Sequence, residues 1–321
     1  MRRNSQKLVK NLPLSVVLIL VAAVYLLSQH FFTDNSDTAV IFADSGYSAG
    51  DIASDELKLC FIDVGQGDST LIKTPDGKFM LIDAGTYESS PKLCGYLTEM
   101  GVSEIEYLVF THPHEDHIGS GADIVNGFKV KNVIMTQKHA LSATYERLVD
   151  ALLDSKTRNG TKIIAPSVSD EYEFSDVSFE VLSADGKNSD TNNSSIVIRL
   201  AYKDCYFMFT GDAERGIEKD IVKEMSALDK DISCILLKCG HHGSDTSSCE
   251  DFLSAVNPQV AVVSCGLDNS YGHPSTKTLK RLYERDIAVY RTDESGDIVF
   301  SCDGQGLYVE STSRQIADLA A

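Results

Sequence analysis

The segment THPHEDHIGS, residues 111–120, carries three histidines and two acids in six consecutive positions. Imidazole and carboxylate groups are the ligands that zinc and similar cations prefer in proteins. The preceding residues 106–110, EYLVF, are mostly apolar and β-prone, so a buried strand should end at the cluster. A loop that leaves a rigid strand can direct several side chains to one point. We therefore predict a metal site here, in preference to a solvated histidine-rich loop.

Other residues of metal-ligand type follow apolar strands elsewhere in the chain. Six of the eight histidines lie in three places, which are the 112–117 cluster, the pair His241 and His242, and His273. FMFTGD, residues 207–212, delivers Asp212 to a strand end in the same way. A Gly-Asp pair alone is more typical of a turn. We nevertheless include Asp212 as a candidate ligand, because it follows an apolar strand as the histidine clusters do.

Three further polar residues lie at strand ends or turns, and two of them have a purely structural alternative. Asp68 closes the glycine-containing turn DVGQGD, where it could orient a metal-bound histidine or simply bond to its own turn. Asp83 in LIDAG should lie near the metals in a supporting role. Lys238 could be solvated, or it could meet an anion beside the metals.

Strand and helix patterns alternate from about residue 56. Runs rich in β-branched and aromatic residues predict strands, and apolar residues at helical spacing predict helices. The predicted strands lie at 57–64, 105–110, 131–137, 172–184, 194–202, 205–212, 234–240 and 259–266, with hairpins at 69–85 and 297–312, and the predicted helices lie at 91–101, 142–157, 213–227, 250–258 and 274–286. Pro274 should lie in the first turn of the last helix. Two successive halves of this kind predict an α/β fold with two packed sheets covered by helices.

Several motifs carry a resemblance to a known family. H-x-H-x-D-H at 112–117, TGD at 210–212 and GHHGS at 240–244 resemble the metal motifs of the metallo-β-lactamase fold. Five segments are similar to the hydrolase domain of the ComEC/Rec2 competence proteins and to the related secreted phosphorylcholine esterases: FIDVGQGDST at 61–70, LIDAG at 81–85, NNSSIVIRL at 192–200, HHGSDTSS at 241–248 and YGHPS at 271–275. The resemblance covers residues 56–311 and implies an αββα sandwich.

The resemblance also implies two divalent metal ions, Zn or Mn, and a ligand set for them. The implied ligands are His112 and His114 for the first ion, Asp116 and His117 with a histidine of the 241–242 pair for the second, and Asp212 as the bridge. Of that pair, His242 is favoured and His241 remains open. No organic cofactor is expected.

One position departs from the pattern of many members of the superfamily. They supply a third histidine to the first ion, whereas the corresponding stretch here, TNNSSIVIRL, contains none. Asn192 or Asn193 would face the site instead. Because an amide oxygen is a weaker ligand than imidazole, the first ion should bind less tightly and a harder ion such as manganese is a candidate. The ComEC-type domains share this asparagine pattern.

For function, the resemblance implies hydrolysis of a phosphodiester, in DNA or in a cell-wall polymer such as teichoic acid, by a hydroxide that bridges the metals. Asp116 would accept a hydrogen bond from that water, and His273 would stabilise or protonate the leaving oxygen. His273 could instead simply begin a helix. The alternatives are an ester or amide hydrolase of the β-lactamase or lactonase type and a degenerate metal-binding scaffold. The missing third histidine disfavours the first, and the retained Asp116 and Asp212 disfavour the second.

Composition and the N-terminal region bear on location. The 321 residues carry a net charge of −18, which argues against nonspecific binding to nucleic-acid phosphates. Residues 1–32 combine a basic start with a long uncharged apolar run and predict a single membrane anchor. Residues 33–55 predict a flexible linker, and residues 56–321 predict a hydrolase domain outside the cell. Secretion after signal-peptide cleavage is the alternative.

The eight cysteines predict no zinc-binding cysteine cluster, because none forms a C-x-x-C pair. Most lie in apolar, strand-like runs. We expect them to act as small buried hydrophobic residues.

Overall fold

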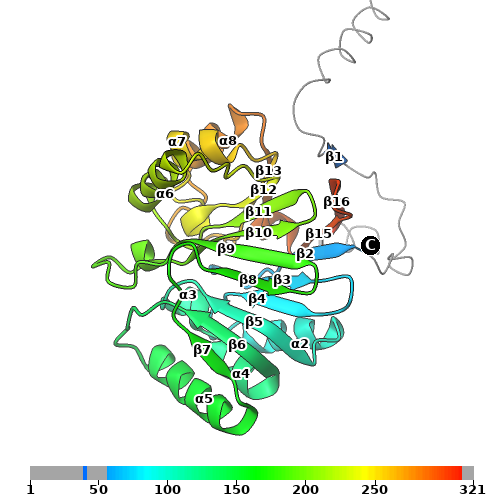
Figure 1. Cartoon of the computed structure of the whole chain (residues 1–321), viewed down its shortest axis with the longest axis vertical. Coiled ribbons are helices and arrows are strands. Elements are labelled where there is room, and N and C mark those ends of the chain that lie inside the picture. The colour runs from blue at the N-terminus through cyan, green and yellow to red at the C-terminus, as the bar shows by residue number, and fades with distance from the viewer. Residues whose placement is uncertain (1–38, 42–55, 313–321) are drawn as a thin grey trace, which may run out of the picture. The chain divides into compact units, whose positions relative to one another are not determined.

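The computed structural model describes residues 39–41 and 56–312, and their elements belong to one compact unit. Two β-sheets face each other in the middle, and helices cover their outer faces (Figure 1). This αββα layering confirms the architecture predicted from the two halves of the sequence.

The first sheet has nine strands in the spatial order β1-β16-β15-β2-β3-β4-β5-β6-β7. Their bounds are β1 Ala39–Ile41, β2 Leu57–Phe61, β3 Thr70–Lys73, β4 Phe79–Ile82, β5 Glu104–Phe110, β6 Lys129–Met135, β7 Lys162–Ile164, β15 Ile298–Cys302 and β16 Gly306–Thr312. β2, β3 and β4 are antiparallel neighbours, whereas β4 to β7 run parallel. The carboxyl ends of β4 and β5 therefore open at the same edge of the sheet.

The second sheet has seven strands in the order β14-β13-β12-β11-β10-β9-β8. Their bounds are β8 Glu171–Phe174, β9 Val177–Ser183, β10 Val197–Tyr202, β11 Cys205–Phe209, β12 Leu236–Lys238, β13 Val260–Val263 and β14 Ala288–Arg291. β11 to β14 run parallel. Their carboxyl ends also share one edge, and loops from this edge carry the second set of candidate ligands.

The main core lies between the sheets. Leu57, Leu59 and Phe61 alternate along β2 and pack into this core with Phe207 and Phe209 of β11. This alternation follows from the period of two in a strand, which sends successive side chains to opposite faces. Burial of the two inner faces therefore holds the sheets together and fixes which loops meet at the shared edge.

Helices pack on the two outer faces through separate apolar clusters. The cluster on the first sheet includes residues of α2 Ser90–Glu99, α3 Glu115–Ile118, α4 Gly121–Gly127 and α5 Ala143–Asn159. The cluster on the second sheet includes residues of α6 Arg215–Ala227, α7 Glu250–Val256 and α8 Thr276–Tyr283. A short helix, α9 Thr292–Ser295, follows β14. The ends of α5 follow sequence rules, because Ser142 caps its first turn by accepting from the Tyr145 N–H and Gly160 ends it in the left-handed conformation.

The structure corrects the sequence-based elements in detail. α8 begins at Thr276 with Ser275 as its cap, so Pro274 precedes the helix instead of lying in its first turn. The sequence pattern does not predict short elements such as α4, β7 and β14. Their seven, three and four residues show too little apolar periodicity to identify a helix or a strand. Seven of the eight cysteines are buried and none is in a disulfide, which confirms their packing role.

The predicted anchor and most of the predicted linker lie outside the described residues. Within the part of the chain that the structure describes, no helix is both long and apolar enough to cross a membrane.

Candidate metal centre

Loops from both sheets meet at one edge of the sandwich. β5 leads into the 111–117 loop, β11 leads to Asp212, and β12 leads to the pair His241–His242. Gly211 lies against Thr111 so closely that an added Cβ would be 2.8 Å from the Thr111 Cβ, and its φ is +52°. Only glycine combines this backbone conformation with so close an approach. Segments about a hundred residues apart in sequence thereby share one pocket.

The first group of candidate ligands consists of His112, His114 and Asp212. His112 Nε2 lies 3.6 Å from an Asp212 oxygen and 3.0 Å from His114 Nδ1. One ligand atom from each of the three lies within 4.8 Å of the others. This clustering suits a single cation held by two imidazoles and a carboxylate.

A second group gathers around the same carboxylate. His117 Nε2 lies 3.2 Å from Asp212 Oδ1, and His242 Nε2 lies 3.7 Å from Asp212 Oδ2. Asp116 Oδ2 is 3.1 Å from His242 Nε2 and 4.0 Å from His117 Nε2. Because Asp212 contacts both groups, it has the position that a carboxylate bridging two cations requires.

Asp83 orients His117, a candidate ligand of the second group. Its carboxylate contacts His117 Nδ1 at 2.8 Å and accepts hydrogen bonds from the Thr111 N–H and hydroxyl, both at 2.8 Å. A carboxylate on the far nitrogen of a histidine fixes the ring's orientation and leaves the other nitrogen free for a metal. The supporting role predicted for Asp83 matches this geometry.

Asp68 and Lys238 form a buried pair behind His242. The Lys238 ammonium donates to Asp68 Oδ2 at 2.6 Å and to the Cys239 carbonyl at 3.0 Å. The other oxygen of Asp68 lies 3.2 Å from His242 Nδ1, which also contacts the Ser264 carbonyl at 3.1 Å. Burial alone would lower the pKa of Lys238, but Asp68 outweighs it and raises that pKa. The anion that Lys238 meets is therefore Asp68.

Asp63 behaves differently from Asp68, although both belong to the turn DVGQGD. An Asp63 oxygen accepts from the Gly65 N–H at 3.1 Å. The structural alternative for this segment, a turn whose carboxylate bonds to its own backbone, thus describes Asp63. Asp68 instead contacts Lys238 of the second sheet.

The loop that carries His241 and His242 is held in an unusual conformation. Both residues have positive φ, at 50° and 51°, which is unfavourable for side chains with a Cβ. The nearby segment is anchored by Glu218, which is buried and accepts from the backbone N–H groups of Ser248 and Cys249 at 2.5 and 2.8 Å. The sequence does not single out Glu218, because it lies in the first turn of α6, where an acidic residue is common and marks no contact.

His241 lies farther from the centre than His242. Its Nε2 is 3.9 Å from Asp212, and its side chain is 23 % exposed, against 2 % for His242. Asn192 contacts His241 Nε2 at 3.4 Å and lines the cavity, as expected for the residue in place of the third histidine. Asn193 turns instead to Glu214, accepting from its N–H at 3.1 Å.

A cavity of about 510 Å³ opens over these groups. Glu115, Asp116, Asp212, His241, His242 and His273 are among the residues that line it. The His273 ring lies 5.4 Å from the His241 ring, and its Nδ1 is buried without a hydrogen-bond partner. Burial and then the neighbouring imidazoles lower the pKa of His273 to about 4.

The residues present fit a pair of cations. His117 Nε2 and Asp212 Oδ1 are buried 3.2 Å apart and neither makes a hydrogen bond to another group, and the buried Asn192 Oδ1 makes none at all. Burial would lower the pKa of His242, but the carboxylates of Asp212 and Asp68 outweigh it and raise that pKa to about 10. The pocket therefore stabilises positive charge at His117 and His242, whereas burial lowers the pKa of His112. Divalent cations that displaced the protons of His117 and His242 would gain the same interactions with the carboxylates.

The fold, with histidines and carboxylates at its shared edge, places this chain among the metal-dependent proteins of one superfamily. The chain belongs to the metallo-beta-lactamase superfamily, whose family model matches residues 62–267.

Named relatives are competence and recombination proteins. The chain is 30 % identical to ComE operon protein 3 of Bacillus subtilis over 77 % of this chain and 33 % of that protein. It is 28 % identical to Competence protein ComA of Neisseria gonorrhoeae over 92 % and 40 %, and 28 % identical to Recombination protein 2 of Haemophilus influenzae over 74 % and 28 %. The ComEC-type resemblance is confirmed, and the chain spans about a third of the length of these relatives.

Solved structures share the fold at low sequence identity. YhfI from Bacillus subtilis, a metallo-beta-lactamase fold protein, superposes with a TM-score of 0.53 at 12 % identity, covering 77 % of this chain and all of that one. The CmlA beta-hydroxylase superposes at 0.50 and 10 % identity, covering 76 % of this chain and 53 % of that one. Because a hydroxylase has the same fold, the fold alone does not select the reaction.

Proposed function

We propose that this chain is a dinuclear metal-dependent hydrolase that cleaves a phosphodiester. The observation that carries the proposal is the meeting of six ligand-type side chains, five of them gathered around the sixth, the buried carboxylate of Asp212. They are His112, His114, Asp116, His117, Asp212 and His242, and they come from three separate loops. Two cations held there, Zn or Mn, would activate a water molecule and stabilise negative charge on the substrate's oxygen.

The chain's own residues have distinct tasks in this reaction. Hydrolysis adds water across a P–O bond, so the attacking oxygen must lose a proton and the leaving oxygen must gain one. Asp116 lines the cavity with its carboxylate 31 % exposed, and can accept a hydrogen bond from the attacking water. His273, whose lowered pKa keeps it neutral at pH 7, can donate a hydrogen bond to the leaving oxygen. Asp83 and the Asp68–Lys238 pair hold His117 and His242 in place.

Phosphodiesters are favoured over esters and amides because of the relatives. Two of the similar proteins are named for competence and recombination, and a β-lactamase or lactonase is less consistent with Asn192 in place of a third histidine. DNA and a cell-wall polymer such as teichoic acid remain the two macromolecular substrates suggested by the sequence.

Metal analysis combined with a diester assay tests the proposal. The purified chain should contain close to two Zn or Mn ions and hydrolyse bis(p-nitrophenyl) phosphate. Asp212→Ala should lose both the metal and the activity, because its carboxylate contacts both groups. A wild-type chain with less than one ion and no hydrolysis would instead support the metal-binding scaffold. Retention of metal and activity by Asp212→Ala would disprove the bridging role.

We also propose a location for the enzyme. Residues 1–32 would anchor it in the cell membrane as a single span, with the hydrolase domain outside the cell. Protease added to intact cells should then remove the domain. Full protection would overturn the orientation, and recovery of a processed chain in the medium would support a cleaved signal peptide.

A further inference from the structure

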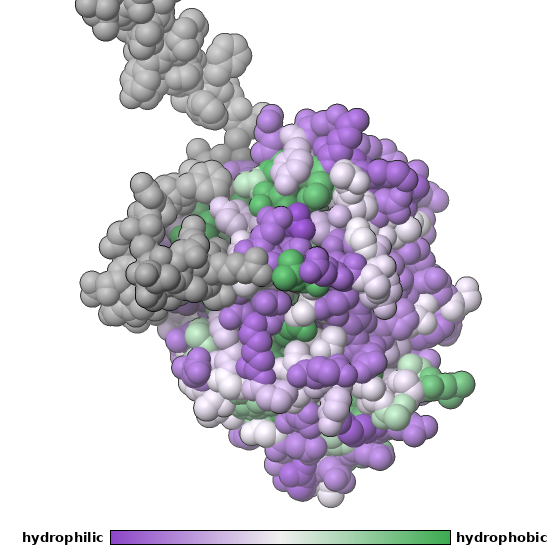
Figure 2. Space-filling model, turned by 180° about the vertical axis from the view of Figure 1, so that it is seen from behind, coloured by the Kyte–Doolittle hydropathy of each residue, from purple (hydrophilic) through white to green (hydrophobic). Residues whose placement is uncertain are grey.

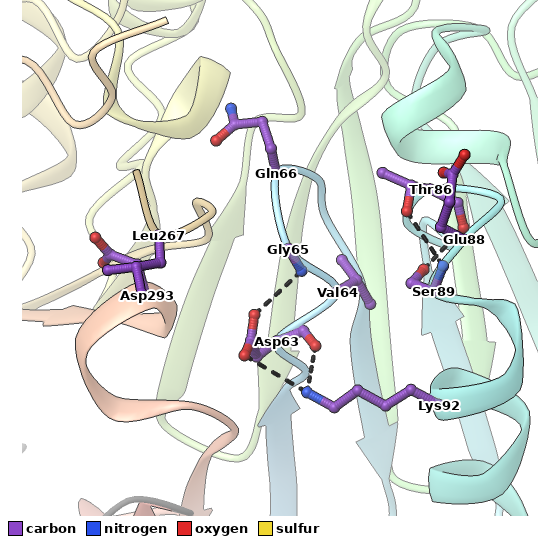
Figure 3. Close-up of a pocket in the computed structure, with 10 residues that line it drawn as sticks. All are labelled: Asp63, Val64, Gly65, Gln66, Thr86, Glu88, Ser89, Lys92, Leu267 and Asp293. Atoms are coloured by element: carbon purple, nitrogen blue, oxygen red, sulfur yellow. Dashed lines mark hydrogen bonds and ion pairs between the residues drawn. The ribbon is translucent and has the colours of Figure 1, made fainter. Parts of the chain in front are cut away.

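A second cavity lies directly beside the one over the metal centre. Its volume is about 600 Å³, and it shares Gln66, Thr86 and Glu88 with the first. Figure 3 shows the turn from Asp63 to Gln66 between the Thr86–Ser89 segment and Leu267 on the opposite wall. A cavity of this size holds a small organic group. The two cavities together could hold both substituents of a phosphodiester whose phosphate lies at Asp212.

The wall of the second cavity combines carboxylates with apolar surface. Asp63, Glu88 and Asp293 supply three acids, and Val64 and Leu267 supply apolar side chains. Leu267 is 67 % exposed, which leaves a hydrophobic face open at this wall. A substituent that is both uncharged and partly apolar would match this surface.

The basic residue on this wall is already neutralised. Lys92 is the one lysine or arginine among the described residues that line either cavity. Its ammonium lies 3.6 Å from an Asp63 oxygen and 3.2 Å from an Asp297 oxygen. It also donates to the Asp63 carbonyl, as Figure 3 shows. Two acids thus compete for one ammonium, which leaves no positive charge to attract a second phosphate.

The carboxylate of Glu88 has no ion-pair partner among the described residues. Glu88 is exposed at the border that the two cavities share. Glu115 lines the first cavity and is equally free of an ion pair among the described residues. Like charges at short range repel, so a substrate with further phosphates next to the scissile one would meet repulsion at this border.

We propose that the second cavity is a substrate subsite for the group esterified to the scissile phosphate, and that Glu88 selects an uncharged or cationic group over a neighbouring phosphate. The subsite rests on the proposed phosphodiesterase function. At the adjoining cavity, the buried Asn192 Oδ1, which has no hydrogen-bond partner, and Asp212 Oδ1, 3.2 Å from His117 Nε2, mark where the phosphate and its metals would bind. Among phosphodiesters, those whose neighbouring group is uncharged or cationic are therefore preferred, and a polymer with neighbouring phosphates, DNA included, should react more slowly than they do.

The test compares two substrates and three variants of the full chain with Mn²⁺ or Zn²⁺. The substrates are bis(p-nitrophenyl) phosphate, with uncharged groups, and single-stranded decathymidylate, with many phosphates. The variants are Glu88→Gln, Glu88→Lys and the matched control Glu99→Gln, which removes the same charge at the exposed end of α2. Glu88 is not among the residues that would hold the metals, so the variants should keep a working centre.

We expect the wild type to prefer the small diester by about 100-fold or more in kcat/KM at low salt, and raising the salt should narrow the difference. Glu88→Gln should raise the ratio of kcat/KM for decathymidylate to kcat/KM for the small diester about threefold, and Glu88→Lys should raise it about tenfold. Glu99→Gln should leave this ratio unchanged. Equal use of both substrates by the wild type, or equal effects of the Glu88 variants on both, would overturn the subsite and leave the phosphodiesterase intact. Hydrolysis of neither substrate by a metal-loaded chain would overturn the proposed function, and the subsite with it.

Discussion

At the scale of single residues, position decides what each polar side chain does. Asp63 and Asp68 lie five residues apart in one turn, yet the first bonds to its own turn and the second reaches Lys238 and His242. The pair His241–His242 divides similarly. Its two rings differ in exposure, at 23 % and 2 %, and in their nearest carboxylate, which is Glu214 at 3.5 Å for His241 and Asp116 at 3.1 Å for His242.

His242→Ala should damage the centre more than His241→Ala. His242 Nε2 is 3.1 Å from Asp116, whereas His241 Nε2 is 3.9 Å from Asp212. We expect His242→Ala to lose about one metal ion per chain and to reduce kcat by more than about 100-fold, and His241→Ala to keep its metals. Elemental analysis and diester kinetics on both variants provide the measurement. The reverse order would exchange the roles of the two residues.

Lys238→Met should destabilise the fold strongly. Asp68 is 4 % exposed, and without the ammonium at 2.6 Å its charge would be buried and uncompensated. Removal of one partner of a buried pair costs about 3–5 kcal/mol. Urea unfolding of the two chains measures the difference. The double variant Asp68→Asn with Lys238→Met should recover part of the loss, and no recovery would show that the lysine stabilises the fold by packing alone.

At the scale of elements, the pocket depends on how closely loops approach one another. The turn between β2 and β3 lies on the metal-binding loop, where the Asp68 N–H donates to the Asp116 carbonyl at 3.1 Å. A Cβ at Gly67 would lie 2.5 Å from that carbonyl oxygen. Elements far apart in the sequence therefore position Asp116 together.

Gly67→Ala should displace the Asp116 loop. The clash is with backbone, which cannot rotate away, so we expect a loss of about 1–3 kcal/mol in stability and about 100-fold in kcat from misplaced side chains. Gly216→Ala in α6 is the matched control, because a Cβ there meets nothing within 4 Å. Stability and activity measured on both variants should separate them. An active Gly67→Ala chain would mean that the loop adjusts freely.

Glu218→Gln tests the anchor of the loop that carries the histidine pair. Loss of one of two buried hydrogen bonds should cost about 1–3 kcal/mol. Burial raises the pKa of Glu218, despite the N–H groups that lower it. The pKa of Glu218 is higher in the folded than in the unfolded state. The wild type therefore loses stability as the pH rises from the unfolded-state pKa through the folded-state pKa, whereas the glutamine of the variant does not titrate. Urea unfolding should therefore show a larger advantage of the wild type at pH 4.5 than at pH 7; an unchanged difference would contradict the raised pKa.

At the scale of the whole molecule, the surface and the centre have opposite electrostatic demands. The net charge is −18, and the face shown in Figure 2 is mostly hydrophilic, with hydrophobic residues in small groups. Buried at the edge of the sandwich, Asp68, Asp83 and Asp212 add negative charge that the fold must balance. Bound cations would supply that balance and join the two sheets.

Removal of the metals should lower the melting temperature. A ligand that binds only the folded state stabilises it, and loss of two tightly bound ions from a domain of this size should lower Tm by about 5–10 °C. Thermal unfolding with and without EDTA measures the shift. Asp212→Ala should already melt at the lower temperature and show no further shift. An EDTA effect of equal size in that variant would place the stabilising ions elsewhere.

Much of the fold and of the centre could be predicted from local patterns. The long strands, α5 and the layer order follow from apolar periodicity. The composition of the 112–117 cluster, rich in histidine and acidic residues, predicts a metal site. The start of α8 was missed because Pro274 favours a first helical turn in general, whereas here Ser275 provides the cap. Glu218 was missed because its partners lie thirty residues away, and a contact at that range leaves no local signal.

The sequence by itself determined which residue types could bind metal and that each would follow a strand, because both depend on local chemistry and periodicity. Only the tertiary structure decided that His242 lies closer to the centre than His241, that Lys238 compensates Asp68, and that Asn192 faces the pocket while Asn193 does not. These choices depend on distances between loops of different sheets, and packing of the two inner faces sets those distances.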